Sequence, residues 1–351
     1  MKIISIVGAR PQFIKLAPLS RELRQYHKEI IIHTGQHFDK EMSEAFFSEL
    51  DIPKPDYNLN INKGLHGEQT GKMLMAIEQT LVKEKPDLII VFGDTNSTLA
   101  GALASAKLQI PSVHVEAGLR SHNRNMPEEI NRIVADHTCN FLFAPTKTAF
   151  ENLEKENLRE SSFLTGDIMS DAHYQALQKA TNSKILINLS LEPNKYYLLT
   201  LHRPYNVDNP EILSNIFTEL SQLNNKIVFP VHPRTKSVIE QNNISFPSNF
   251  IPIKPMGYLD FIKLQANSLK IITDSGGIQK EAYILKKPCI TLRSETEWVE
   301  TVNAGWNVLI NPIKEANYAK TIENFSPPNK YEKIFGEDVA RKMTEIITKN
   351  V

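Results

Sequence analysis

Short apolar runs alternate with longer amphipathic stretches along most of the chain. The apolar runs have the length of buried parallel strands, and the amphipathic stretches repeat apolar residues at helical spacing. In the first half we expect strands at 3–7, 30–33, 88–92, 113–116, 141–144 and 162–164, and helices at 13–26, 40–50, 68–84, 95–107 and 128–136. This alternation predicts an α/β fold in which helices cover parallel sheets.

The alternation is interrupted by a polar stretch and later by prolines. Residues 179–195 show no clear period and indicate a connection between domains. The second half resumes with strands expected at 196–201, 227–230, 250–253, 270–273 and 288–292, and Pro327 and Pro328 precede a final helix at about 332–349. We therefore predict two Rossmann-like, doubly wound domains at 1–178 and 179–328 and a last segment at 329–351. Functional loops are expected at the carboxyl ends of the strands.

Composition and charge narrow the possible partners. The 351 residues fit two α/β domains. Lys and Arg together number 40, as do Asp and Glu, and this balance argues against a nucleic-acid binder.

Cys139 and Cys289 lie in apolar stretches and are expected to be reduced core thiols. No apolar run has the length of a signal peptide or a membrane span, so we expect a cytoplasmic protein without membrane contact.

Two cations follow the first expected strand, near the start of a helix. Gly8 permits a tight turn, and Arg10 and Lys15 come soon after it. The free amides of a helix N-terminus and nearby cations are a natural site for an anion. The turn lacks the GxGxxG pattern and the acidic residue of a dinucleotide site. Arg10 taken alone is equally typical of a surface ion pair.

Carboxylates occur where the next strands end. Asp94 follows one strand, Glu116 closes the next, and Glu128 lies in a pair of glutamates that begins a helix. An ionised carboxylate at the end of a buried strand is poorly explained by stability. Three carboxylates on one rim suit general acid and base catalysis, because neighbouring charges separate their pKa values. A capping role stays open for Asp94, and a helix-dipole role for one of the two glutamates. The spacing is not typical of a metal site, and we expect no metal.

The second half contains a turn suited to phosphate. The strand at 270–273 leads into Asp274-Ser275-Gly276-Gly277 and a helix, where two glycines let the backbone approach a diphosphate. Glu281, one helical turn later, is placed to accept the hydroxyls of a ribose. Further polar residues and an aromatic one follow or precede neighbouring elements: His202, Arg203, His232 and Phe261.

Taken together, these blocks resemble the non-hydrolysing UDP-N-acetylglucosamine 2-epimerases. The matching segments are GARPQFIKLAP, HTGQHFD, GDTNSTLAGALA, HVEAGLRS, MPEEINR, LHRPYNVDN, HPRT, GYLDF, TDSGGIQKEA and TLRSETEWVE. They run in the family's order from residue 3 to about 310, which makes chance similarity implausible. The resemblance implies a GT-B arrangement, with a cleft between two Rossmann-like domains and a last helix that returns to the first.

The resemblance also implies a reaction and its residues. UDP and the C2 proton leave to give 2-acetamidoglucal, and UDP is then added back with C2 inverted, without NAD or any other cofactor. The catalytic residues of the family match Asp94, Glu116, Glu128 and His202. The residues matched to binding of the UDP-sugar are Arg10, Lys15, Arg203, His232, Phe261, Ser275, Gly276, Gly277 and Glu281. A homodimer and a place in polysaccharide biosynthesis are implied as well.

Two departures from the bacterial pattern leave the substrate open. Trp298 stands where the bacterial motif Thr-Glu-Arg-Pro-Glu has arginine, and Phe38 stands where Gln-His-Arg has arginine. The first departure resembles a subgroup that includes epimerases of UDP-2,3-diacetamido-glucuronate. The second bears on a region that binds a second, activating UDP-sugar in the bacterial enzymes. The alternatives are therefore epimerisation of UDP-N-acetylglucosamine or of the uronate sugar, a hydrolysing epimerase, a GT-B glycosyltransferase, and a non-catalytic UDP-sugar-binding protein.

Overall fold

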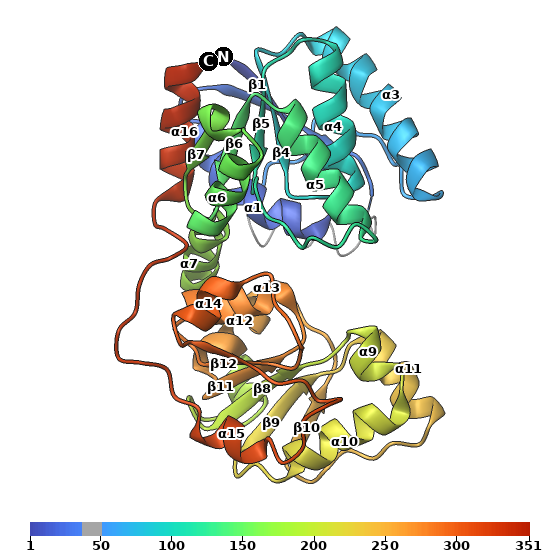
Figure 1. Cartoon of the computed structure of the whole chain (residues 1–351), viewed down its shortest axis with the longest axis vertical. Helices are drawn as coiled ribbons and strands as arrows, with labels where there is room; N and C mark the ends of the chain where they lie inside the picture. The colour runs from blue at the N-terminus through green and yellow to red at the C-terminus, as the bar shows by residue number, and fades with distance from the viewer. Residues whose placement is uncertain (37–50) are drawn as a thin grey trace. The chain divides into compact units, whose positions relative to one another are not determined.

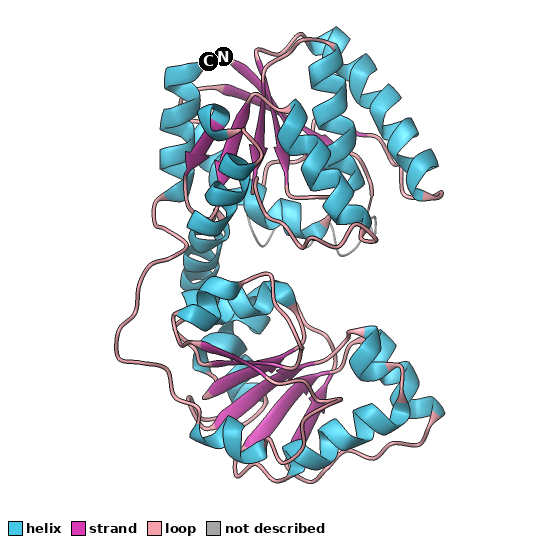
Figure 2. Ribbon diagram, viewed as in Figure 1, coloured by secondary structure: helices cyan, strands magenta, loops and turns pink. Residues whose placement is uncertain are grey.

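The computed structural model describes residues 1–36 and 51–351, apart from the side chain of Arg10. The chain divides into two compact units, Met1–Gln175 with Ile334–Val351 and Ala176–Lys333. Figure 1 shows a sheet within each unit, and Figure 2 shows helices against these sheets. The helix predicted at 40–50 and residues 37–39 of the HTGQHFD segment lie outside the described residues.

The first unit contains a parallel sheet of seven strands in the order β3-β2-β1-β4-β5-β6-β7. Its strands are β1 (Lys2–Val7), β2 (Lys28–His33), β3 (Tyr57–Asn58), β4 (Leu88–Phe92), β5 (Ser112–Val115), β6 (Phe141–Ala144) and β7 (Ser162–Leu164). Its helices are α1 (Arg10–Leu23), α3 (His66–Glu84), α4 (Asn96–Lys107), α5 (Pro127–Thr138), α6 (Lys147–Lys155), the short η1 (Arg159–Ser161), α7 (Met169–Lys179), which continues into the second unit, and α16 (Val339–Asn350).

Alternate residues of the first sheet support opposite layers of helices. Ile4 and Ile6 of β1 belong to a core cluster that includes residues of α3, α4 and α5. On the other face α1 packs against α16, as Figure 1 shows. The last helix begins later than predicted, at Val339, because Asp338 adopts a left-handed backbone with φ 49° directly before it. Its first turn receives a carboxylate from another helix, since the Ala340 amide donates to Asp171 at 2.8 Å.

The second unit contains a parallel sheet of six strands in the order β10-β9-β8-β11-β12-β13. Its strands are β8 (Tyr196–Thr200), β9 (Lys226–Pro230), β10 (Phe250–Ile253), β11 (Lys270–Thr273), β12 (Cys289–Thr291) and β13 (Asn307–Leu309). Its helices are η2 (Ala180–Asn182), α8 (Ile185–Asn188), α9 (Pro204–Val207), α10 (Pro210–Ser221), α11 (Pro233–Gln241), α12 (Tyr258–Asn267), α13 (Gly276–Ile284), α14 (Val299–Asn303) and α15 (Ala319–Asn324).

The two parallel sheets with alternating helices confirm the predicted α/β class with two doubly wound units. Both sheets have the strand order of a doubly wound fold, with crossovers on either side of the first strand. Cys139 and Cys289 are free and buried, and burial raises the pKa of each thiol to about 12. Among the described residues, no helix combines the length and the apolar character needed to cross a membrane.

The register of the strands determines which turns lie side by side. In the first unit Phe92 lies opposite Val115, so the turns that follow β4 and β5 start at the same level of the sheet. In the second unit Thr200 lies opposite Thr273, and their hydroxyls are 2.6 Å apart. The turns that follow β8 and β11 are therefore neighbours as well. Asp94 and Glu116 follow the first pair of strands, and His202 and Ser275 follow the second pair.

Candidate active site

The turn after β4 presents Asp94 beside a cation that the sequence patterns did not reveal. Arg132 of α5 forms an ion pair with the Asp94 carboxylate and lies 3.2 Å from that of Glu129. The residue that caps α4 is Thr95, whose hydroxyl accepts from the Thr98 amide. The side chain of Asp94 is thus not used as the helix cap and faces Arg132.

Glu116 directly follows β5 and has an unusual backbone conformation. Its φ of 75° lies in the left-handed region, which costs a residue with a Cβ roughly 1–2 kcal/mol. Lys15 of α1 places its Nζ 2.7 Å from Glu116 Oε1, and both side chains are largely buried. Lys15, predicted to bind substrate, thus contacts one of the predicted catalytic carboxylates.

The charges of Asp94 and Glu116 both act on the Arg132 guanidinium. Burial alone lowers the pKa of this guanidinium, but the carboxylates of Asp94, Glu129 and Glu116 outweigh burial and raise it. Two of the three predicted catalytic carboxylates therefore lie close enough to act on the same positive charge. Within residues 1–36 and 51–351, no cluster of three or more His, Cys, Asp or Glu side chains is arranged to hold a metal ion.

The two glutamates that begin α5 have different environments. Glu129 is buried and accepts hydrogen bonds of 2.9 Å from the amides of Ser121 and His122 and from the Ser121 hydroxyl. Its carboxylate therefore holds the loop before the helix. Glu128 is exposed at the same helix end. The structure thus leaves Glu128, the predicted catalytic residue, available to a ligand.

The turn after β1 is held by a buried glutamine. Gln12 Oε1 accepts from the amides of Gly8 and Ala9 at 2.7 and 3.0 Å, while its Nε2 donates to the Phe92 carbonyl at 2.7 Å. Gln12 thereby joins the turn after β1 to the end of β4. Arg10 is the first residue of α1, and its side chain lies outside the described part of the chain.

In the second unit, His202 follows β8 and is held by a fully buried aspartate. Asp274 accepts from the amides of His202 and Arg203 at 3.1 and 2.9 Å, and from Asn206 Nδ2 at 3.2 Å. His202 Nδ1 lies 3.2 Å from Asp274 Oδ1. Burial lowers the pKa of His202, and the charge of Asp274 offsets this only in part.

His232 lies beside His202 in the neighbouring turn. Their ring centres are 5.5 Å apart and the rings are tilted by 39°. His232 Nδ1 accepts from the Arg234 amide at 3.2 Å, so the neutral ring carries its proton on Nε2. Arg203, between β8 and α9, is half-buried. The structure thus brings together the three polar residues predicted at this edge of the second sheet: His202, Arg203 and His232.

The predicted phosphate turn connects β11 to α13. Ser275 precedes the helix, and its amide donates to Thr273 Oγ1 at 2.9 Å. A Cβ at Gly276 would lie 1.8 Å from Glu297 Oε1, whereas a Cβ at Gly277 would meet nothing within 4 Å. A carboxylate oxygen of the chain therefore packs against the start of α13, where helix amides favour an anion.

The predicted ribose and uracil contacts lie on neighbouring helices. Glu281 of α13 accepts from Gln265 Nε2 at 2.7 Å, and Gln265 is fully buried in α12. Phe261, also in α12, is half-buried and packs against a core cluster of the unit. Trp298, at the first departure from the bacterial motif, lies beneath Lys280, whose Nζ is 4.3 Å from the ring centre.

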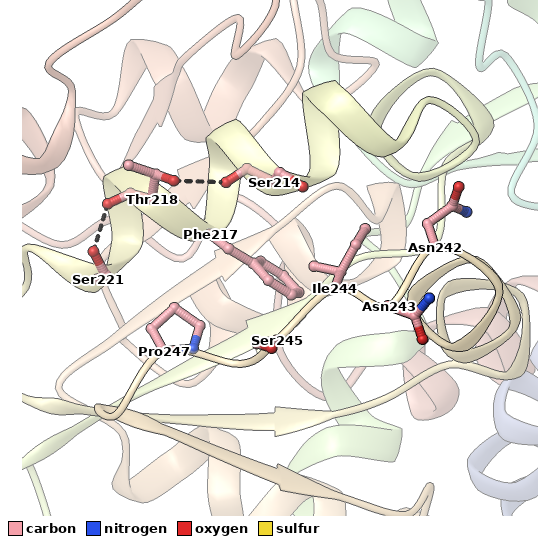
Figure 3. A pocket seen from close by; sticks show the side chains of 9 residues that line it. All are labelled: Ser214, Phe217, Thr218, Ser221, Asn242, Asn243, Ile244, Ser245 and Pro247. Atoms are coloured by element: carbon pink, nitrogen blue, oxygen red, sulfur yellow. Dashed lines mark hydrogen bonds between the residues drawn. The ribbon is translucent and has the colours of Figure 1, made fainter.

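A separate pocket of about 430 Å³ lies between α10 and the loop after α11. Figure 3 shows its lining residues, among them Phe217, Asn242 and Ser245. These segments lead into the amino ends of β9 and β10, whereas the predicted site residues follow the carboxyl ends of the strands. Its lining includes none of those residues. Since ligands of doubly wound sheets bind at the carboxyl ends, we place the candidate site there.

Comparison with known proteins identifies the family of the chain. The family model described as UDP-N-acetylglucosamine 2-epimerase matches residues 21–348. A UDP-N-acetylglucosamine 2-epimerase homolog of Methanococcus maripaludis is 53% identical over 99% of both chains. The UDP-2,3-diacetamido-2,3-dideoxy-D-glucuronate 2-epimerase of Pseudomonas aeruginosa is 48% identical over 90% of both chains. The crystal structure of Methanocaldococcus jannaschii UDP-GlcNAc 2-epimerase, in complex with UDP-GlcNAc and UDP, superposes with a TM-score of 0.88 at 43% identity and covers 100% of both chains. The chain therefore belongs to the UDP-N-acetylglucosamine 2-epimerase family.

Proposed function

We propose that the chain is a non-hydrolysing epimerase that interconverts UDP-N-acetylglucosamine and UDP-N-acetylmannosamine. The observation that carries the proposal is the pair of carboxylates at the ends of neighbouring strands, Asp94 and Glu116, each in an ion pair with a buried cation. Stability gives little reason to place two such carboxylates at one sheet edge. The Methanocaldococcus jannaschii relative, crystallised with UDP-GlcNAc and UDP, supports the same substrate.

The first unit supplies the proton chemistry of this proposal. One carboxylate of the set Asp94, Glu116 and Glu128 takes the proton from C2, and the electron pair of the C–H bond forms the C1–C2 double bond as the C1–oxygen bond to UDP breaks. The products of this step are 2-acetamidoglucal and UDP. Return of UDP to C1, with a proton delivered to the opposite face of C2, gives the manno sugar.

The second unit holds the nucleotide and the departing charge. Ser275, Gly276 and Gly277 bind the diphosphate, because the helix amides and the absence of side chains favour close approach of an anion. Glu281, held by Gln265, accepts the ribose hydroxyls, and Phe261 contacts the uracil. The remaining polar residues of this unit bind the diphosphate as UDP leaves: Arg203, His202 and His232. Positive charge at that point stabilises the charge that develops on UDP.

A specific observation favours a second substrate, UDP-2,3-diacetamido-glucuronate. The Pseudomonas aeruginosa relative named for that sugar is 48% identical over 90% of both chains. Trp298, buried beneath Lys280, also stands where the bacterial motif has arginine. The chemistry at C2 is the same for both sugars, and the difference lies in which sugar the chain binds.

Incubation of the chain with each UDP-sugar, without any acceptor, tests the proposal and ranks the substrates. The proposal predicts a manno product by proton NMR, with the sugar still attached to UDP. Asp94→Asn should lower the rate roughly 10²–10⁴-fold, because a general base is lost. Asp208→Asn, at an exposed ion pair of the second unit, is the matched control and should keep the rate. Release of free sugar, or activity only after addition of an acceptor, would contradict the proposal.

We further propose that the chain forms a homodimer in the cytoplasm. Three large apolar side chains on α3 or directly before it are exposed, Leu65 at 83%, Met75 at 59% and Val82 at 56%, and exposed apolar groups on one element are typical of interfaces. The two free cysteines suit a reducing compartment. Light scattering should give twice the chain mass, and Met75→Glu with Val82→Glu should give the monomer. A monomeric wild-type chain would refute this part.

A further inference from the structure

A fully buried histidine connects the two turns that carry Asp94 and Glu116. His114 lies in β5, and its Nδ1 is 2.6 Å from Asp136 Oδ1 of α5. Its Nε2 is 2.6 Å from the carbonyl oxygen of Gly93, the residue before Asp94. The side chains of His114 and Asp136 are both 0% exposed. Neither residue belongs to the carboxylate set that performs the proposed reaction.

The contacts of His114 hold its ring between two acceptors. A carbonyl oxygen only accepts, so Nε2 carries a hydrogen and donates it to Gly93. On the other side of the ring, Nδ1 faces the Asp136 carboxylate. Asp136 also accepts from the Gly118 amide at 3.1 Å and from Arg120 Nη1 at 2.7 Å. Burial raises the pKa of Asp136, but its interactions with His114 and Arg120 outweigh burial and lower it.

His114 belongs to a connected group of polar side chains. Arg120 Nε lies 2.7 Å from Glu156 Oε1, in addition to its contact with Asp136. Asp136 thus contacts both His114 and Arg120, and Arg120 connects it to Glu156. A buried charge is retained where it is paired and hydrogen-bonded on all sides.

His114 and Asp136 hydrogen-bond to the backbone just before Asp94 and just after Glu116. On one turn, His114 holds the carbonyl of Gly93, whose φ of +62° directs the chain into Asp94. On the other, Asp136 holds the amide of Gly118, two residues after Glu116 with its φ of 75°. Both turns adopt left-handed backbone that needs support from the surrounding structure.

We propose that His114 is a positioning residue for the C2 epimerisation, acting through Gly93 and Asp136 to set the separation of Asp94 and Glu116. The inference rests on the proposed function, because it gives His114 a role in that reaction. His114 touches no substrate, and it acts on the carboxylates only through the backbone. Its loss displaces the carboxylates while the nucleotide-binding residues of the second unit keep their places.

The test compares His114→Gln with His173→Gln at a temperature where both variants are folded. His173 is also fully buried in the first unit, and its Nδ1 lies 2.6 Å from the Met169 carbonyl. His114→Gln should lower kcat roughly 10- to 100-fold, since a displacement of about 1 Å has such effects on catalysis. The Kd for UDP should change less than about twofold, because the turn and helices proposed to bind the diphosphate, ribose and uracil are in the second unit, away from His114. His173→Gln should change stability without this loss of kcat.

If His114→Gln does not fold, a second variant and a measurement on the wild-type chain test the same role of His114. Asp136→Asn should reproduce the loss of kcat, and the double variant should be no slower than the slower single variant. Nitrogen NMR of the wild-type chain labelled at histidine should show a hydrogen on Nε2 of His114, donated to the Gly93 carbonyl. A His114 ring without a hydrogen on Nε2, or wild-type kcat in folded His114→Gln, overturns the proposal. If turnover and C2 exchange are absent from the wild-type chain as well, the proposed function fails, whereas the protonation measurement still reports on His114.

Discussion

Replacement of Asp274 by asparagine is the sharpest perturbation of the second unit. The fully buried carboxylate accepts from two backbone amides, those of His202 and Arg203, and from Asn206 Nδ2. It also faces His202 Nδ1 at 3.2 Å. An asparagine has the same shape, but one of its oxygens becomes an amino group that only donates. Either orientation of the amide therefore places a donor against donors.

The size of the effect follows from these contacts. A hydrogen bond to a charged group contributes about 1.5–3 kcal/mol, and in either orientation of the amide at least one is lost, so Asp274→Asn should cost about 1.5–3 kcal/mol of unfolding free energy. For a unit of this size that corresponds to a fall in Tm of about 3–12 °C. His202 also loses the carboxylate that orients its ring, and kcat should fall roughly 10²–10⁴-fold.

Calorimetric melting and steady-state epimerase assays measure the two effects separately. Asp208→Asn is the control, because it removes the carboxylate of an exposed ion pair with Arg234 in the same unit. That variant should keep the wild-type Tm and kcat. The double variant of Asp274→Asn and His202→Asn should be no slower than His202→Asn, since both act through one imidazole. A folded Asp274→Asn chain with wild-type kcat would show that this carboxylate does not orient His202.

Three further predictions follow from the site. Gly276→Ala brings a Cβ within 1.8 Å of Glu297 Oε1, so calorimetry should show a UDP affinity about tenfold weaker or worse and a lower Tm. Gly277→Ala, whose Cβ would meet nothing within 4 Å, should keep the wild-type Tm. Equal melting temperatures of the two variants would contradict this packing. Burial lowers the pKa of His202, whereas a bound diphosphate favours the imidazolium, so binding of UDP should take up a proton. The affinity of the chain for UDP should therefore rise as the pH falls from about 8 toward 6. Calorimetry in buffers of different ionisation enthalpy measures the proton uptake, which must be larger in the wild type than in His202→Asn. Burial raises the pKa of Glu129, but hydrogen bonds from Ser121 and His122 and the charge of Arg132 outweigh burial and lower it. The stability that Glu129 contributes is therefore present above the unfolded pKa of about 4.3 and is lost as the pH falls through the lower folded pKa. Urea midpoints of Glu129→Gln should change less between about pH 5 and pH 3 than those of the wild type, and parallel curves would contradict this assignment.

The strands that form the centre of each sheet could be predicted from the sequence. The observed bounds of β4 (Leu88–Phe92) and β11 (Lys270–Thr273) agree with the prediction, because continuous apolar runs of that length are typical of strands buried on both faces. The edge strand β3, Tyr57–Asn58, was missed since two residues give no periodic pattern. The start of α16 was placed too early because polar residues after Pro328 do not reveal a left-handed turn at Asp338.

The residues that hold the site were harder to find than the predicted site residues themselves. Asp274 and His202 are 72 positions apart, and Arg132 and Asp94 are 38 apart, so no local pattern connects them. Strand register brings the first pair together, and the packing of α5 brings together the second. Asp274 was visible next to the phosphate turn, but its complete burial is a property of the folded unit. A local motif can predict a turn, whereas the partners of its side chains depend on the whole sheet.

In the proposed reaction, the chain removes and restores the C2 proton of a UDP-sugar. The most direct measurement is incubation of the chain with UDP-N-acetylglucosamine in deuterated water, followed by proton NMR and mass spectrometry of the UDP-sugars. We expect deuterium at C2 in both UDP-N-acetylmannosamine and the recovered starting sugar, and incorporation slowed roughly 10²–10⁴-fold with Asp94→Asn. A manno product without deuterium at C2, or no exchange with either this sugar or the uronate, would contradict the proposed reaction.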